Sequence, residues 1–317
     1  MGSLQAAYSE DKGSRLTMED VAVISHKAGT STTAGCRLSF FAIFDGHGGA
    51  SVARYAADHL HGCIMAAGLQ QEAERLAAAA AAAATAPAAA APAAAAGDSP
   101  GAAQPAAQIK QCRAALAEGF RELDRRVLEQ CAAAGWQDGC TAVVAYVVGD
   151  AVLVANVGDA RCVLARQPQA AAAAPQGEQG RWRAPLKAIT LTREHKAIFP
   201  QERQRIEKAG SFVSGDGRLA GRIEVSRAFG DRPFKRQGMT AVPDIQAFQL
   251  SSRDAFLLLA CDGFWGVFSP QDAVDYARRE LGLGKGVKQT CNRLIYEAIR
   301  ERKCKDNCTV MLVAFGC

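Results

Sequence analysis

The sequence has few histidines and no closely spaced pair of cysteines. Only 5 of the 317 residues are histidine, and none of the 11 cysteines forms a CxxC pair. This pattern disfavours a zinc ribbon, and the odd number of cysteines disfavours a disulfide framework. Several cysteines, such as Cys261, lie in apolar runs, where a reduced thiol packs as a small hydrophobic side chain. We therefore expect an intracellular protein, cytoplasmic or nuclear or both.

The sequence also lacks a strong charge of one sign. Lys and Arg number 37 against 32 Asp and Glu, which gives a formal net charge of +5. A protein that binds a polyanion usually has a strongly basic surface, so we expect no nucleic-acid partner. A composition of 49% hydrophobic and 22% charged residues is typical of an ordinary globular protein.

No signal for export, lipid attachment or membrane insertion is readable. The first residues lack the basic-then-apolar pattern of a secretory signal, and Ala6 stands where a myristoylation motif has Ser or Thr. The one long apolar stretch, 77–107, has 21 alanines among its 31 residues and is interrupted by Pro87, Pro92, Pro100 and Pro105. Alanine supplies little transfer energy and the prolines interrupt a helix, so we expect no membrane span. The stretch is instead predicted to be a flexible insert, helical in its first alanine run.

Without this insert, the chain has the length of one large sheet-based domain. We therefore predict a single domain over 1–317, with the insert at 77–107 and a polar loop at 167–185. Hydrophobic periodicity predicts the following elements: strands at 21–24, 40–44, 141–148, 151–157, 161–165, near 189, at 256–260 and at 309–315, and helices at 50–69, 108–133, 201–209, 270–281 and 287–301. Consecutive strands joined by tight turns, as at 141–165, indicate an antiparallel meander, and the fold class is predicted to be α+β.

Aspartates stand at the ends of four of the predicted buried strands. Asp45 follows FFAIF, Asp159 follows VANVG, Asp262 follows FLLLAC and Asp306 precedes CTVMLVAF. A turn or capping role would explain any one of them. If all four converge, however, their like charges require a cation, and oxygen-only ligands suit Mg²⁺ or Mn²⁺. His47, in the DGHGG segment beside Asp45, is then well placed to act as an acid or a base.

Nine motifs, in order along nearly the whole chain, resemble those of the metal-dependent serine/threonine protein phosphatases of type 2C. They are KGSRLTMED (12–20), FAIFDGHGG (41–49), DGCTAVV (138–144), VANVGDAR (154–161), LTREHK (191–196), EVSRAFGD (224–231), VPDI (242–245), LLACDGFW (258–265) and KDNCTVMLV (305–313). Within that family, VSRAFGDRPFK, LLACDGFWGVF and CNRL look most like the integrin-linked-kinase-associated phosphatases.

The resemblance implies a four-layer αββα sandwich, in which helices flank two antiparallel sheets, and two Mg²⁺ or Mn²⁺ ions. It implies that Asp45 bridges both ions, that the Gly46 carbonyl binds one, and that Asp262 and Asp306 bind the other. Glu19 and Asp20 would hold metal-bound waters, and Arg15 would bind the phosphate.

The implied reaction is one-step hydrolysis of phosphoserine and phosphothreonine esters in protein substrates, by an enzyme that acts as a monomer. A hydroxide bridging the two ions would attack phosphorus, and His47 would protonate the leaving group. No protein nucleophile is needed. Cys140 in DGCTA would therefore not be catalytic, since the chain has no phosphate-cradling loop that ends in Arg.

One position, Gly266, departs from the family pattern in a way that bears on metal binding. Many members have an aspartate where this chain has Gly266, and that aspartate helps Asp159 to bind a weaker third metal. Gly266 therefore puts a third ion at Asp159 in doubt.

Two alternative functions are less consistent with the sequence. A catalytically inactive scaffold of the same fold would be expected to lack core ligands, which are all present here. A metal-dependent nuclease would be expected to have a more basic surface.

Overall fold

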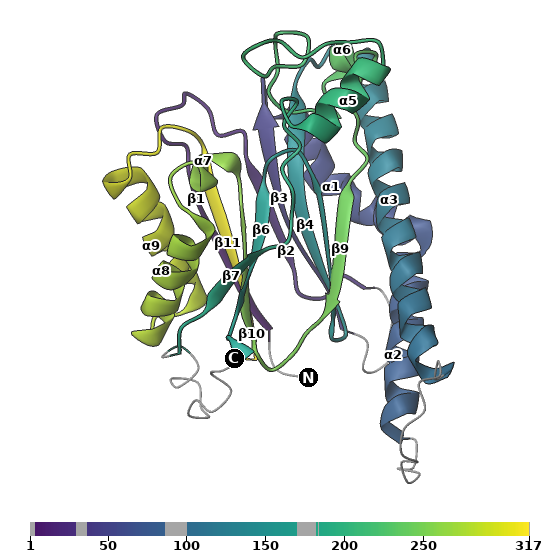
Figure 1. Ribbon diagram of the computed structural model, residues 1–317, viewed down its shortest axis with the longest axis vertical. Coiled ribbons are helices and arrows are strands. Elements are labelled where there is room, and N and C mark those ends of the chain that lie inside the picture. The colour runs from purple at the N-terminus through teal and green to yellow at the C-terminus, as the bar shows by residue number, and fades with distance from the viewer. Residues whose placement is uncertain (1–3, 30–36, 86–99, 170–181, 183, 317) are drawn as a thin grey trace.

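The computed structural model describes the chain except for residues 1–3, 30–36, 86–99, 170–181, 183 and 317. Two antiparallel β-sheets pack face to face at the centre of the molecule, and helices cover the outer face of each (Figure 1). The predicted fold, an α+β sandwich of two antiparallel sheets between helices, is therefore confirmed.

The first sheet has five strands in the order β1-β11-β10-β6-β7. Their bounds are β1 Leu4–Asp11, β11 Cys308–Phe315, β10 Asp254–Ala260, β6 Arg161–Arg166 and β7 Lys187–Thr190. The second sheet has six strands, five of them in the order β2-β3-β4-β5-β9, with the short β8 paired to β4. Their bounds are β2 Val21–Ser25, β3 Leu38–His47, β4 Gly139–Val148, β5 Ala151–Val157, β9 Asp244–Gln249 and β8 Phe229–Gly230.

Helices of very different length cover the two sheets. The six-stranded sheet is covered by α1 (Ser51–Ile64), the π-helical segment η1 (Met65–Leu69), α2 (Gln70–Thr85) and α3 (Pro100–Ala134). The five-stranded sheet is covered by α8 (Pro270–Gly282), α9 (Val287–Tyr296) and the π-helical segment η3 (Glu297–Glu301). The short helices α5 (Pro200–Lys208), α6 (Arg232–Lys235) and α7 (Asp262–Trp265) lie toward one end of the sandwich (Figure 1).

The sequence of β3 explains why this strand is buried on both faces. Successive side chains of a strand point to opposite faces. Phe41 and Ile43 accordingly join the core between the two sheets, whereas Phe40 and Phe44 join the core beneath α1 and α3. All four side chains are at most 1% exposed. Because both faces of β3 are packed, the position at which the strand ends, and with it the position of Asp45, is fixed by the core.

The meander predicted over 141–165 is correct for its first part and wrong for its last. Strands β3, β4 and β5 are neighbours in one sheet, but β6 pairs with β10 in the other. The Gly158-Asp159 segment is therefore a crossover between the sheets. Gly158 has φ +91°, and its N–H donates to His195 Nδ1 at 3.2 Å. A positive φ favours glycine, which explains why the chain can change sheet within a few residues.

Several other elements differ from the prediction. Strands β1 and β9, and the short β8, α6 and α7, were not predicted. The first alanine run of the insert is helical, as predicted, since α2 continues to Thr85, but the helix predicted at 108–133 starts earlier, since α3 begins at Pro100. Residues 86–99 of the insert and most of the 167–185 loop lie outside the described residues. Within the described part of the chain, no helix combines the length and the hydrophobicity needed to cross a bilayer.

Candidate metal centre

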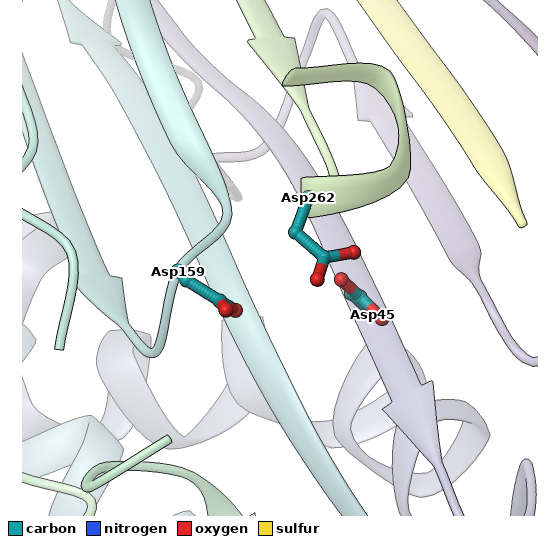
Figure 2. A group of neighbouring side chains, drawn as sticks. All are labelled: Asp45, Asp159 and Asp262. Carbon is teal, nitrogen blue, oxygen red and sulfur yellow. The ribbon is translucent and has the colours of Figure 1, made fainter. Parts of the chain in front are cut away.

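Three of the four predicted carboxylates converge at one end of the sandwich. Asp45 lies near the end of β3, Asp159 in the crossover between β5 and β6, and Asp262 at the start of α7, directly after β10. Each offers a carboxylate oxygen, and these oxygens all lie within 4.8 Å of one another. Figure 2 shows the carboxylates of Asp45 and Asp262 facing each other, with that of Asp159 directed toward them from the crossover. Asp45, Asp159 and Asp262, which lie at strand ends of both sheets, thus form one acidic group.

The electrostatics of this group favour a bound cation. The pKa of Asp45 is raised well above its usual value by removal from water and then by the charges of Asp20 and Asp262. Burial, followed by the charge of Asp262, raises the pKa of Asp159 to about 7. Burial and the charge of Asp306 raise the pKa of Asp262. Bare carboxylates at this spacing resist ionisation, whereas a divalent ion would stabilise all of them in the charged form.

Asp20 supplies a further sign of a cation site. Its Oδ2 accepts a hydrogen bond from the Thr309 hydroxyl at 2.6 Å, but its buried Oδ1 has no protein partner. Burial raises the pKa of Asp20 to about 6. A buried oxygen without a partner costs free energy unless water or an ion satisfies it. All these donors are oxygens, so the residues present fit Mg²⁺ or Mn²⁺.

Asp306 lies beside this group and is paired with Arg15. Asp306 Oδ2 accepts from Arg15 Nη2 at 2.7 Å, and both side chains are substantially exposed. The structure therefore places the predicted phosphate-binding arginine directly on a predicted metal ligand. Arg15 is held there because Asn307 Nδ2 donates to the carbonyls of Lys12 (3.0 Å) and Thr17 (2.9 Å) on either side of it.

Glu19 joins this loop to the DGHGG segment. Its Oε1 accepts from the Thr17 hydroxyl at 2.9 Å, and its Oε2 accepts from the Gly49 N–H at 3.2 Å. A Cβ at position 46 would lie 2.6 Å from the Glu19 carbonyl oxygen. Only glycine allows β3 and the segment before β2 to approach so closely at Gly46.

His47 has a buried partner that the sequence did not indicate. Its Nε2 lies 2.8 Å from Oδ2 of Asp231, whose side chain is 4% exposed. Burial lowers the pKa of His47, but the hydrogen bond and the charge of Asp231 outweigh it, so that the pKa is raised. Asp231 is the last residue of the EVSRAFGD motif, but its distance of 184 residues from His47 gave no sign of the contact.

Two other predictions concern residues near the acidic group. Cys140 is fully buried, and burial followed by the charge of Asp45 raises the pKa of its thiol well above the usual value. A protonated thiol is a poor nucleophile, which agrees with a non-catalytic Cys140. At the predicted third-metal position, the Lys196 ammonium lies 3.7 Å from Asp159 Oδ2, and Gly266 offers no side-chain ligand.

A cavity of about 570 Å³ opens over the carboxylates. Its lining includes the predicted site residues Arg15, Glu19, Asp45, Gly46, His47, Asp159, Asp262 and Asp306. Arg218 and Glu224, which form an ion pair, also line it. The cavity thus combines an acidic floor with a guanidinium and an imidazole, an arrangement that can bind metal ions and a phosphoryl group together.

Comparisons with known proteins agree with this geometry. The family model described as "Protein phosphatase 2C" matches residues 5–308. The "Probable protein phosphatase 2C 8" of Arabidopsis thaliana is 43% identical, over 98% of this chain and 79% of the relative. The "Integrin-linked kinase-associated serine/threonine phosphatase 2C" of Bos taurus is 34% identical, over 99% of this chain and 77% of the relative.

A solved structure shows the same fold. It is a serine-threonine phosphatase 2C from Toxoplasma gondii, which superposes with a TM-score of 0.77 at 21% identity, over 98% of this chain and 95% of that chain. The family model and the relatives cover almost the whole described chain, including every strand that contributes to the acidic group. The chain therefore belongs to the protein phosphatase 2C family.

Proposed function

We propose that this metal-dependent serine/threonine phosphatase hydrolyses phosphoserine and phosphothreonine esters of proteins in one step, without a covalent enzyme intermediate. The main support is the convergence of Asp45, Asp159 and Asp262 within 4.8 Å beneath a cavity that Arg15 and His47 also line. Burial also raises the pKa of the Cys140 thiol well above its usual value, which argues against a thiolate nucleophile at this position.

Two Mg²⁺ or Mn²⁺ ions, held by Asp45, the Gly46 carbonyl, Asp262 and Asp306, would supply a water that is deprotonated near neutral pH and would neutralise charge on the phosphoryl oxygens. Glu19 and Asp20 would hold waters around them. The orphaned Oδ1 of Asp20 supports that role, because it is buried and has an unused acceptor.

Arg15 and His47 would act on the substrate itself. The Arg15 guanidinium offers paired donors that match two phosphoryl oxygens, and loops tied to Asn307 hold it at the cavity. A phosphate would compete with Asp306 for this guanidinium. His47 would protonate the departing alkoxide, a contribution of about 10² to 10⁴ in rate for a positioned general acid.

We also propose an oligomeric state and a cellular location for the enzyme. We expect it to act as a monomer on phosphoproteins inside the cell. Nine cysteines in the described ranges are free thiols and all are buried. Free buried thiols are typical of proteins of reducing compartments, which supports an intracellular location.

The test is hydrolysis of a phosphothreonine peptide with and without Mn²⁺. We expect activity that depends on Mn²⁺ and falls by about 10²-fold or more in Asp45→Asn and in Asp262→Asn, because metal assistance is worth several kcal/mol. Asp150→Asn, an exposed carboxylate in the β4–β5 turn, is the matched control and should retain wild-type activity. Metal-independent hydrolysis, or wild-type rates in both site variants, would contradict the proposal.

A further inference from the structure

Asp231 makes a directed contact with the imidazole of His47. Its Oδ2 lies 2.8 Å from Nε2 of the ring, and its side chain is 4% exposed against 33% for His47. The contact joins the end of β3 to the turn after β8, so it is a tertiary contact between segments that are far apart in the sequence. Asp231 has φ +48°, a left-handed conformation that aspartate and asparagine tolerate better than most residues.

The turn that contains Asp231 is anchored on both sides. Its own N–H donates to the carbonyl of Asp138 at 3.1 Å. Asp124 on α3 accepts from the Gly230 N–H at 3.1 Å and from the Lys235 ammonium at 2.8 Å with each carboxylate oxygen. Lys235 in turn donates to the carbonyl of Ala228 at 2.8 Å. The backbone of the turn that carries Asp231 is thus anchored to α3 and to Asp138 independently of His47.

The structure also keeps open the space in which the two side chains meet. Gly139 on β4 pairs with both His47 and Gly230. A Cβ at position 139 would lie 2.3 Å from Asp231 Oδ2 and 2.4 Å from His47 Nε2. Any side chain there would separate the carboxylate from the imidazole. The absence of a side chain at Gly139 is therefore a condition for the contact.

We propose that Asp231 is a positioning residue, which engages Nε2 of His47 and thereby leaves Nδ1 as the atom that gives its proton to the leaving oxygen of the substrate. The proposal rests on the proposed role of His47 as general acid. An imidazole that hydrogen-bonds a carboxylate through one nitrogen has its tautomer and ring orientation fixed, so only the other nitrogen is available. The proton given up comes from Nδ1 of the doubly protonated ring, and the Nε2–H stays hydrogen-bonded to Asp231 throughout the step.

The test compares two substrates that differ in their need for a proton. The alkoxide that leaves phosphothreonine is a strong base and needs protonation, whereas the phenolate that leaves p-nitrophenyl phosphate does not. In Asp231→Asn, with Mn²⁺ present, we expect kcat for a phosphothreonine peptide to fall by roughly 10-fold or more. The fall with p-nitrophenyl phosphate should be several times smaller. Asparagine keeps the size and the left-handed conformation, so the variant retains the backbone of the turn.

Two comparisons separate positioning from a loss of stability. Asp254→Asn also removes a buried carboxylate, one that is paired with Arg166 in the other sheet, and should leave the ratio of the two activities unchanged. His47→Gln should show the same leaving-group dependence as Asp231→Asn. The double variant should be little worse than His47→Gln alone, because residues that act as one unit are not additive.

A third measurement uses the wild-type protein and does not depend on whether a variant folds. Nitrogen NMR of labelled histidine should show the neutral ring of His47 with its proton on Nε2. A proton on Nδ1, or equal losses on both substrates in Asp231→Asn, would overturn the positioning role while leaving the phosphatase intact. Absence of Mn²⁺-dependent hydrolysis in the wild-type enzyme would instead overturn the proposed function.

Discussion

At the scale of single residues, the acidic group makes stability depend on pH. The pKa of Asp159 is about 7 in the folded protein, against 3.8 for the unperturbed group. The folded state therefore binds a proton more tightly than the unfolded state. The stability that Asp159 contributes is full below about pH 4 and is lost as the pH rises through about 7.

This shift predicts the behaviour of the metal-free protein. In the presence of a chelator, the contribution of Asp159 to the free energy of unfolding should fall by about 2 kcal/mol between pH 5.5 and pH 8. Other groups titrate in the same window, among them His195, whose pKa is lowered chiefly by burial and which therefore acts in the opposite direction. The measurement is thus the difference between wild type and Asp159→Asn in urea unfolding at both pH values. A pH-independent difference would contradict the predicted protonation.

The residues of the site differ in how far the sequence could identify them. Asp45, Asp159 and Asp262 were identifiable because each ends a strongly apolar run, and the core fixes where such a run ends. The contact of Asp306 with Arg15 was not, because the conformation of the 12–19 loop depends on hydrogen bonds from the distant Asn307. Asp231 was missed because its partner comes from another part of the chain.

At the scale of elements, periodicity identified the strands buried on both faces and the long helices. Strand β1 was missed because its sequence, LQAAYSED, contains no strong apolar run. It is a strand because it pairs with β11 along its whole length. The crossing of β6 to the other sheet could not be read from a short glycine-aspartate turn, which fits a hairpin equally well. The early start of α3 at Pro100 agrees with the tolerance of a first helical turn for proline.

The alanine-rich segment can be tested as an element. The adjoining ends of α2 and α3 lie at the opposite end of the molecule from α7, which begins with Asp262 (Figure 1). Deletion of 77–107 should therefore leave kcat on a phosphothreonine peptide within about 2-fold of wild type, although lost packing between α2 and α3 should lower the unfolding temperature. A large fall in kcat for a variant whose circular dichroism shows native folding would mean that this segment affects the site.

At the scale of the whole molecule, the acidic group connects the two sheets. Asp45 lies in β3 of the six-stranded sheet, and Asp20 directly precedes β2 of the same sheet. In the five-stranded sheet, Asp262 follows β10 and Asp306 precedes β11. Without a cation, their mutual repulsion acts across the junction of the sheets. An ion bound by ligands from both sheets would reverse that effect.

Metal binding should therefore stabilise the entire sandwich and not only the loops around the site. A ligand at 100 times its Kd adds about 2.7 kcal/mol to the free energy of unfolding. We expect saturating Mn²⁺ to raise the unfolding temperature of the wild type, and amide hydrogen exchange to slow at the ends of both β3 and β10. The unfolding temperature of Asp150→Asn should rise equally, and that of Asp45→Asn much less. Slower exchange in only one sheet would show that the stabilisation by the ion is local and that the ion does not connect the two sheets.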